Sequence, residues 1–151
     1  MDALTTGTLN IALGQNSLGA STTGVNNIAI GKLALGACTL AGCNNIALGA
    51  LSGDAMTSGS YNIVMGENTG GSLNTGSDNF YAGRGTAAAD TTGCDNIAIG
   101  QSALAVSADD ADNNIAIGKT AMGGADVSSE GSIAIGTDAG KVVTTAGEGI
   151  Y

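Results

Sequence analysis

Three cysteines are the residues of this sequence best suited to redox or metal chemistry. They are Cys38, Cys43 and Cys94, and the sequence contains no histidine. Cys38 and Cys43 are close enough in the chain to form a disulfide within one loop, whereas Cys94 follows Cys43 by 51 residues. Because a structural zinc site needs four sulfur or nitrogen ligands, we predict no metal site and interpret the cysteines as small apolar residues of a reduced protein.

Acidic and aromatic residues form two further candidate groups. Asp109, Asp110 and Asp112 carry the oxygen ligands that Ca²⁺ prefers, but the repeated Gly-Asp pattern of calcium-binding solenoids is absent, so the sequence favours a solvated acidic turn. Tyr61, Tyr81 and Arg84 are a candidate ligand patch, since aromatic rings beside an arginine can bind a sugar.

The segment that contains two of these residues has a second interpretation. In the run Asn79-Phe80-Tyr81-Ala82-Gly83-Arg84, a large ring at Phe80 stands beside a small side chain at Ala82. Such a pair keeps the volume of a packed core roughly constant. Volume compensation therefore explains the unusual residues as well as ligand binding does.

Several classes of function are disfavoured by composition. Without histidine, Ser-His-Asp and Cys-His catalysis cannot be built, and no phosphate loop or nucleotide-binding fingerprint is present, so we predict neither enzyme activity nor a cofactor. The formal net charge of −9, with 4 Lys plus Arg against 13 Asp plus Glu, disfavours nucleic acid as a partner. No run of 18 apolar residues exists that would insert into a membrane.

An internal repeat organises the whole chain, residues 1–151, into one array. The word Asn-Ile-Ala-Ile/Leu-Gly starts at successive intervals of 17, 18, 17, 17, 17, 18 and 18 residues, and a ninth copy opens at Gly149. Most copies begin with asparagine and all eight complete copies end with glycine; these positions are Asn10, Gly14, Asn27, Gly31, Asn45, Gly49, Asn62, Gly66, Asn79, Gly83, Asn96, Gly100, Asn114, Gly118 and Gly136.

The repeat predicts an all-β fold. Aliphatic residues two apart, such as Ile28 and Ile30, have the period of a strand, and the recurring glycine marks a corner. A second apolar pair, such as Ala34 and Leu35, predicts a second short strand in each unit. Because a unit of 17 or 18 residues has no room for its own core, the units must stack as eight to nine coils of a parallel β-solenoid or β-roll. Equivalent asparagines would then form a ladder of side-chain hydrogen bonds.

Both faces of the expected strand are apolar, and the row of small residues between the aliphatic ones includes Ala29, Ala47 and Ala98. In a single thin coil this alanine row would face water. Several chains packed side by side would cover it, and a homotrimer with small residues near the shared axis is the expected closed arrangement. The sequence does not decide which row faces the axis.

Copies such as Asn96 to Ala103 (NIAIGQSA) and Asn27 to Leu35 (NIAIGKLAL), joined by Thr-Thr-Gly turns, resemble the repeats of phage tail fibres and the head repeats of trimeric autotransporter adhesins. The resemblance implies a left-handed solenoid, three chains to a fibre, and a stalk or receptor-binding surface. It also implies a host-surface receptor or polysaccharide as the partner, and a location on a virion tail or at a cell surface.

The expected function is therefore structural and adhesive. A phage tail-fibre segment is the first interpretation, because the autotransporter repeat is typically shorter than 17 residues. The head or stalk of a bacterial trimeric adhesin is the alternative, together with an extracellular filament whose subunits stack end to end. The sequence begins in a turn and stops inside a strand word, which favours a piece of a longer fibre or such a filament.

Overall fold

The computed structural model describes residues 6–19, 23–36, 40–107, 111–124, 130–142 and 149–151. In these ranges the chain forms eight strands of three residues each. They are β1 (Ile11–Leu13), β2 (Ile28–Ile30), β3 (Ile46–Leu48), β4 (Ile63–Met65), β5 (Phe80–Ala82), β6 (Ile97–Ile99), β7 (Ile115–Ile117) and β8 (Ile133–Ile135). Each strand coincides with the three central residues of the repeated word, as the period of two predicts.

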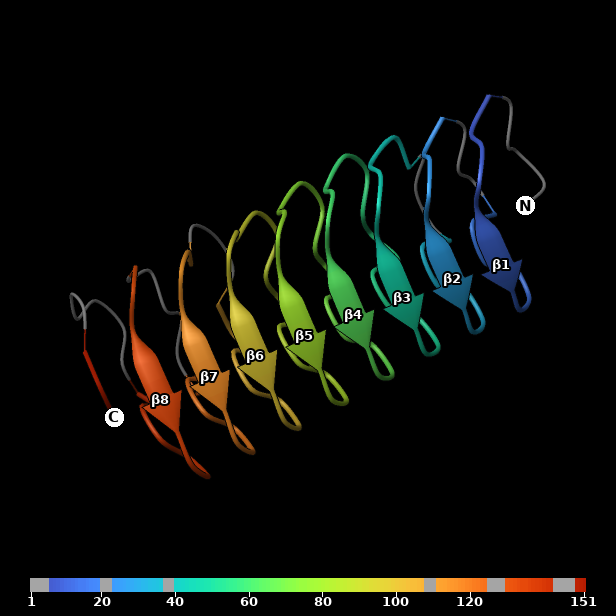
Figure 1. Cartoon of the computed structure of the whole chain (residues 1–151). Helices are drawn as coiled ribbons and strands as arrows, with labels where there is room; N and C mark the ends of the chain where they lie inside the picture. The colour runs from blue at the N-terminus through green and yellow to red at the C-terminus, as the bar shows by residue number, and fades with distance from the viewer. Residues whose placement is uncertain (1–5, 20–22, 37–39, 108–110, 125–129, 143–148) are drawn as a thin grey trace.

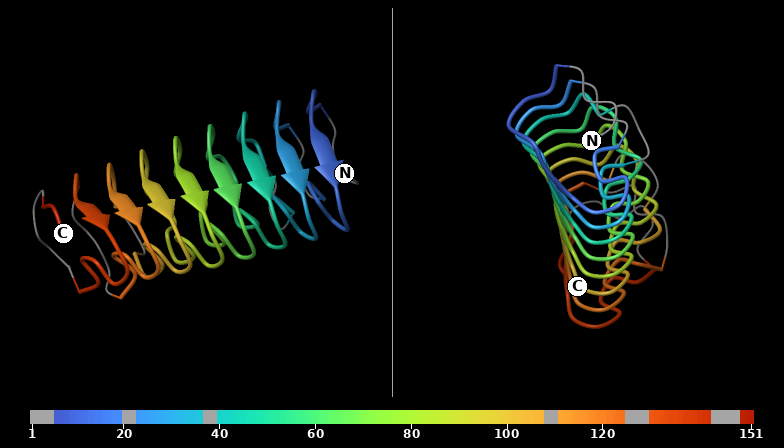
Figure 2. Two further views of the ribbon diagram at one scale, coloured as in Figure 1. Left: turned by 60° about the horizontal axis from the view of Figure 1, so that its bottom comes forward. Right: turned by 90° about the vertical axis from the view of Figure 1, so that its right-hand side faces the viewer.

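The strands form one parallel sheet in chain order, β1 to β8. Each strand pairs with the next at equivalent positions, for example Ile28 with Ile46 and Ala29 with Ala47. The chain returns from one strand to the next by a single turn of a β-solenoid, which confirms the predicted fold class (Figure 1). We number each coil by its strand. Seen from the N-terminal end, successive coils have similar outlines and each is displaced a little from the one before (Figure 2).

The expected second strand in each unit is not found in the described residues. After the strand, the chain follows a series of turns in which residues with positive φ recur at fixed positions. In coil 2 these are Gly31, Leu33 and Leu35. Asn26, which precedes the strand, also has positive φ. Four left-handed residues in one coil bend the chain too sharply for an extended segment, so hydrogen bonds between coils, such as Leu35 N–H to Ser52 C=O, replace a second ladder.

A column of buried asparagines connects the coils, as the sequence predicts. The side-chain oxygen of Asn27 accepts a hydrogen bond from the backbone N–H of Asn45 in the next coil at 2.9 Å. Its Nδ2 donates to the carbonyl of Gly42, in the turn that leads into that coil, at 2.9 Å. Asn45 and Asn62 repeat both bonds one and two coils further on. Each asparagine thus satisfies a buried donor and a buried acceptor of the next coil.

The glycine that ends each repeated word is required by the backbone. Gly66 has φ of 132°, a conformation that L side chains rarely adopt. A Cβ at Gly66 would also lie 2.5 Å from the carbonyl oxygen of Gly83 in the next coil. The predicted corner is therefore confirmed, and the glycine column also allows the backbones of neighbouring coils to approach closely.

The alanine row lies inside the coil, which corrects the expectation that it would face water. Ala29, Ala47 and Ala98 are fully buried, whereas the flanking isoleucines point outward. Alternate residues of a strand point to opposite faces, and the interior of so short a coil is narrow. Small residues therefore belong on the inner side of the strand, opposite the larger buried side chains of the turns, rather than at an axis shared between chains.

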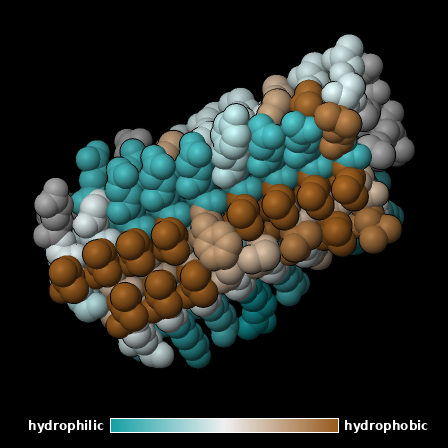
Figure 3. All heavy atoms as spheres, viewed as in Figure 1, coloured by the Kyte–Doolittle hydropathy of each residue, from teal (hydrophilic) through white to brown (hydrophobic). Residues whose placement is uncertain are grey.

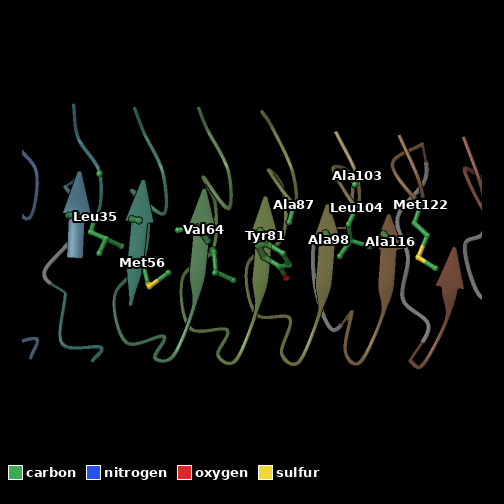
Figure 4. Packing of buried hydrophobic residues seen from close by; sticks show 14 of the residues in the cluster. Leu35, Met56, Val64, Tyr81, Ala87, Ala98, Ala103, Leu104, Ala116 and Met122 are labelled. Carbon is green, nitrogen blue, oxygen red and sulfur yellow. The ribbon is translucent and has the colours of Figure 1, made fainter. Parts of the chain in front are cut away.

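In some coils the interior is filled by compensation between two positions of the same coil (Figure 4). Where the strand contributes Ala98, the turn contributes Leu104, and both are fully buried. Where the strand contributes the larger Tyr81, the turn has only Ala87 at the equivalent place. Close packing of this kind makes the total volume of each coil more constrained than any single residue.

Substitution of Gly66 by alanine tests the glycine column. We expect a loss of at least about 2 kcal/mol in the free energy of unfolding, because the new Cβ adds backbone strain and a clash with a carbonyl group. Urea unfolding followed by circular dichroism measures the change.

Gly85→Asn is the matched control in the adjacent coil. Gly85 also has positive φ, at 62°, but a Cβ there meets only the Ser102 hydroxyl, at 3.8 Å. Asn16 and Asn68 hold the equivalent position in other coils, so this variant should lose less than about 0.5 kcal/mol. Equal losses in the two variants would contradict the proposed role of close backbone approach.

Candidate interaction face

The strands carry an outward apolar face composed of two columns. The first column contains the first residue of each strand: Ile11, Ile28, Ile46, Ile63, Phe80, Ile97, Ile115 and Ile133. The second contains the third residue: Leu13, Ile30, Leu48, Met65, Ala82, Ile99, Ile117 and Ile135. Both columns lie opposite the buried central residues, and we call them together the outward apolar face.

This face is continuous along the rod, and its residues range from partly buried to exposed. Ile97 and Ile99 of β6 are 38% and 36% exposed, and exposure rises to 55% at Ile11 and 62% at Ile135 near the two ends of the sheet. Figure 3 shows the band of apolar side chains crossing the molecule between two polar margins. Eight strands about 4.8 Å apart make this strip roughly 34 Å long.

The margins of the face differ in charge. The margin before the strands contains the exposed Asp78 and Asp95. The margin after the glycine column contains Lys32, Arg84 and Lys119, which are three of the four basic residues of the chain. Glu67 is the acidic exception on this second margin. The two margins of the apolar face thus differ in charge: acidic residues lie on one side and mainly basic residues on the other.

The three residues of the predicted ligand patch do not meet at the surface. Tyr61 is 60% exposed beside the face and Arg84 is exposed on its far margin, but Tyr81 is fully buried inside coil 5. The central residue of a strand points inward here, whether it is alanine, valine or tyrosine. The compensation proposed for Phe80 and Ala82 also does not concern the coil interior, because both side chains lie on the outward face.

Tyr81 instead belongs to a buried polar cluster. Its hydroxyl donates a hydrogen bond to Oδ2 of Asp90, while Oδ1 of Asp90 accepts from the backbone N–H of Gly93 at 2.9 Å. The Asn96 side chain donates to the Tyr81 oxygen at 3.4 Å. Burial raises the pKa of Asp90, and burial together with the Asp90 charge raises the pKa of Tyr81. The cluster replaces an apolar side chain that the same place holds in other coils, such as Leu73.

Cys43 and Cys94 occupy one column with Ser60 and Ser77 between them. The Ser60 hydroxyl accepts from the Cys43 N–H at 3.0 Å, the Ser77 hydroxyl from the Ser60 N–H at 3.1 Å, and the Cys94 sulfur from the Ser77 N–H at 3.4 Å. Both cysteines are free thiols. Three coils separate them, as the repeat predicts, so they cannot bond to each other. Cys38 lies outside the described residues, and with it the predicted alternative of a loop disulfide.

The described residues contain no group of three or more metal-ligating side chains and no surface pocket. Of the acidic turn, Asp109 and Asp110 lie outside the described residues, while Oδ1 of Asp112 accepts the Cys94 N–H at 2.7 Å. Asp112 therefore continues the serine and cysteine column by one coil. Within the part of the chain that the structure describes, no helix has the length and hydropathy needed to cross a membrane.

The outward apolar face is the feature that sequence reasoning missed. A partial signal was present in the pairing of strand centre and turn. Some coils combine an alanine at the strand centre with a leucine in the turn, as in Ala98 with Leu104, whereas coil 5 combines the larger Tyr81 with Ala87. Residues that compensate each other in volume share an interior.

Architecture and geometry together define the chain as a parallel β-solenoid with one unpartnered apolar face. Comparison of the chain with protein-family models, with curated proteins and with solved structures finds no match.

Asp90→Asn tests the buried carboxyl group through the pH dependence of stability. A folded-state pKa raised above the unfolded value near 3.8 means that the folded protein binds the proton more tightly. As the pH falls from 7 toward 3.8, the wild type should therefore gain stability relative to Asp90→Asn. Urea unfolding of both proteins at several pH values measures the difference.

Asp138→Asn should show the opposite change of relative stability with pH. The Lys141 side chain lowers the pKa of Asp138 and forms an ion pair with it at 3.1 Å. The wild type should accordingly lose stability relative to Asp138→Asn as the pH falls through 3.8 and below. Parallel curves for wild type and Asp90→Asn would refute the buried, proton-binding environment of Asp90.

Proposed function

We propose that the chain is a segment of a fibrous, receptor-binding appendage, of the phage tail-fibre kind, in which three copies associate side by side through the outward apolar face. The observation that carries the proposal is this face on a rod whose interior is already filled. Tyr81, Leu35 and Met122 complete the core of their own coils, so the exposed isoleucines are not needed there. A contiguous apolar strip along a whole rod, bordered by polar residues, is typical of surfaces that bind a partner.

A second copy of the chain is the partner that the face fits best. The face repeats at the strand spacing of about 4.8 Å, and an identical array has the same repeat. Side chains of one copy can then lie between those of its neighbour at every coil. Burial of apolar area at about 25 cal/mol per Å² would favour such an association. In a trimer around one axis, the face of each copy would be covered by its two neighbours. The alanines remain inside each coil rather than at the axis.

An adhesive role follows from the form of such a fibre. A rod of equivalent coils places its turns along the outer side of the assembly, and three copies display each turn three times. Weak contacts with a repetitive host receptor or polysaccharide gain strength from this multivalency when their spacing permits simultaneous binding. The resemblance of the repeats to tail fibres and to trimeric adhesins supports the same function. A bacterial surface adhesin remains the alternative owner of such a segment.

Ile97→Lys tests the association. A lysine in the middle of the face places a charge in an apolar interface, so we expect the wild type to sediment as a trimer and the variant mainly as a monomer with an unchanged circular dichroism spectrum. Sedimentation velocity measures both states.

Val106→Lys is the matched control, because Val106 is an exposed apolar residue of the same coil, 45% exposed, that is not part of the face. It should remain a trimer. A monomeric wild type, or dissociation of the Val106 variant to the same extent, would contradict the proposed use of the face.

Adhesion is tested with the assembled protein on a panel of immobilised polysaccharides and intact cells. We expect retention of the trimer, weaker retention of Ile97→Lys, and polysaccharide of unchanged length after incubation. Absence of retention on every surface would refute an adhesive role, and shortened polysaccharide would indicate an enzyme instead.

A further inference from the structure

The two margins of the outward apolar face distinguish the ways in which copies of the chain can associate. If the copies are related by an axis along the rod, the first column and acidic margin of one copy lie against the second column and basic margin of the next. If they are antiparallel, related by a two-fold axis along the strands, like margins meet and Asp78 and Asp95 of one copy approach the acidic margin of the other. Like charges placed together disfavour an interface.

Coil 5 contains opposite charges at the same level of the rod. Asp78 directly precedes the buried Asn79 of this coil, and Arg84 directly follows Gly83. Both side chains are exposed, and within the described part of the chain neither takes part in an ion pair. The extended backbone from Asn79 to Gly83 spans about 13 Å. The two charges are therefore too far apart to pair within one copy.

The apolar columns of coil 5 show the same complementarity in volume. Phe80 is the one aromatic residue of the first column, and Ala82 is the one alanine of the second. In a single subunit both point away from the core, so the coil interior gains nothing from the pairing. In a parallel assembly with coils at the same level, Phe80 of one copy lies against the space that Ala82 of the next leaves.

From charge and volume together, we infer that the copies associate parallel and in register around an axis along the rod. In coil 5, Asp78 of each copy pairs with Arg84 of its neighbour, and Phe80 packs over the neighbour's Ala82. The inference rests on the proposed association of three copies around one axis, which already makes them parallel, and adds to it the residues of coil 5 that set the register. It also explains how one chain selects a single arrangement along a face that otherwise repeats at every coil.

Spin labels test the direction of the copies. Gln15 and Gln101 are exposed at the same position of coils 1 and 6, and each is replaced by a labelled cysteine in a background with Cys38, Cys43 and Cys94 changed to serine. Serine already occupies the cysteine column at Ser60 and Ser77. Electron paramagnetic resonance should give the same label-to-label distance at both sites. Distances that differ by more than about 10 Å between the sites would overturn the parallel arrangement, because antiparallel copies separate increasingly away from their two-fold axis.

Charge exchange tests the pair in coil 5. Asp78→Arg alone and Arg84→Asp alone should each weaken association about tenfold or more, since each places like charges together, and the double exchange should return it to within about threefold of the wild type. Lys119→Asp is the control, because it makes the same charge change on the same margin but at the level of the neutral Asn113. Its effect should be smaller than that of Arg84→Asp.

The outcomes separate this inference from the proposed function. A wild type that stays monomeric refutes both. A stable oligomer with unequal label distances refutes the parallel arrangement and with it the association of three copies around one axis. A stable trimer whose affinity the double exchange fails to restore refutes only the pairing inferred in coil 5 and leaves side-by-side association in place. Equal distances together with restored affinity support it.

Discussion

The fold depends on a hydrogen bond that a buried asparagine makes to the coil after its own. The side chains of Asn27, Asn45 and Asn62 each accept a hydrogen bond from the backbone N–H of the equivalent asparagine in the next coil. Each also donates a hydrogen bond to a backbone carbonyl in the turn before that asparagine. These backbone groups are shielded from water and costly to leave without partners. One side-chain amide supplies both partners, so it fixes the position of each coil relative to the next one along the rod. The register of the sheet, the close approach at the glycine column and the alignment of the outer columns all follow from that spacing.

Much of this architecture could be predicted from the sequence because the same pattern of residues recurs in each repeat. The period of two located the strands, the glycine column located the corner, and stacking of asparagines on asparagines was confirmed at each described interior coil from Asn27 to Asn96. The orientation of the strand was not predictable in this way, since both of its faces are apolar. Alternation alone cannot say which face is inside when neither is polar. The burial of Tyr81 shows the consequence, because an aromatic residue that looked suited to a surface patch completes a core.

Functional reasoning meets a different difficulty. A repeat that builds a rod constrains nearly every residue for the sake of stacking, so few positions remain whose identity reports on a ligand. The departures from the repeat are therefore the most informative residues. Coil 5 contains several of them, and they divide between the inside, where Tyr81 and Asp90 replace apolar packing, and the outside, where Phe80, Ala82, Asp78 and Arg84 vary the face. The proposed association between copies accounts for the outer group, and volume and hydrogen bonding within the coil account for the inner one.

Hydrogen exchange at individual backbone amides tests the asparagine column most directly. If the side chains bind the next coil as described, the amides of Asn45, Asn62, Asn79 and Asn96 should exchange about a thousandfold or more slowly than freely exposed turn amides, and as slowly as the strand amides beside them. Protection restricted to the strand residues, with the asparagine amides exchanging at the rate of exposed turns, would contradict the account.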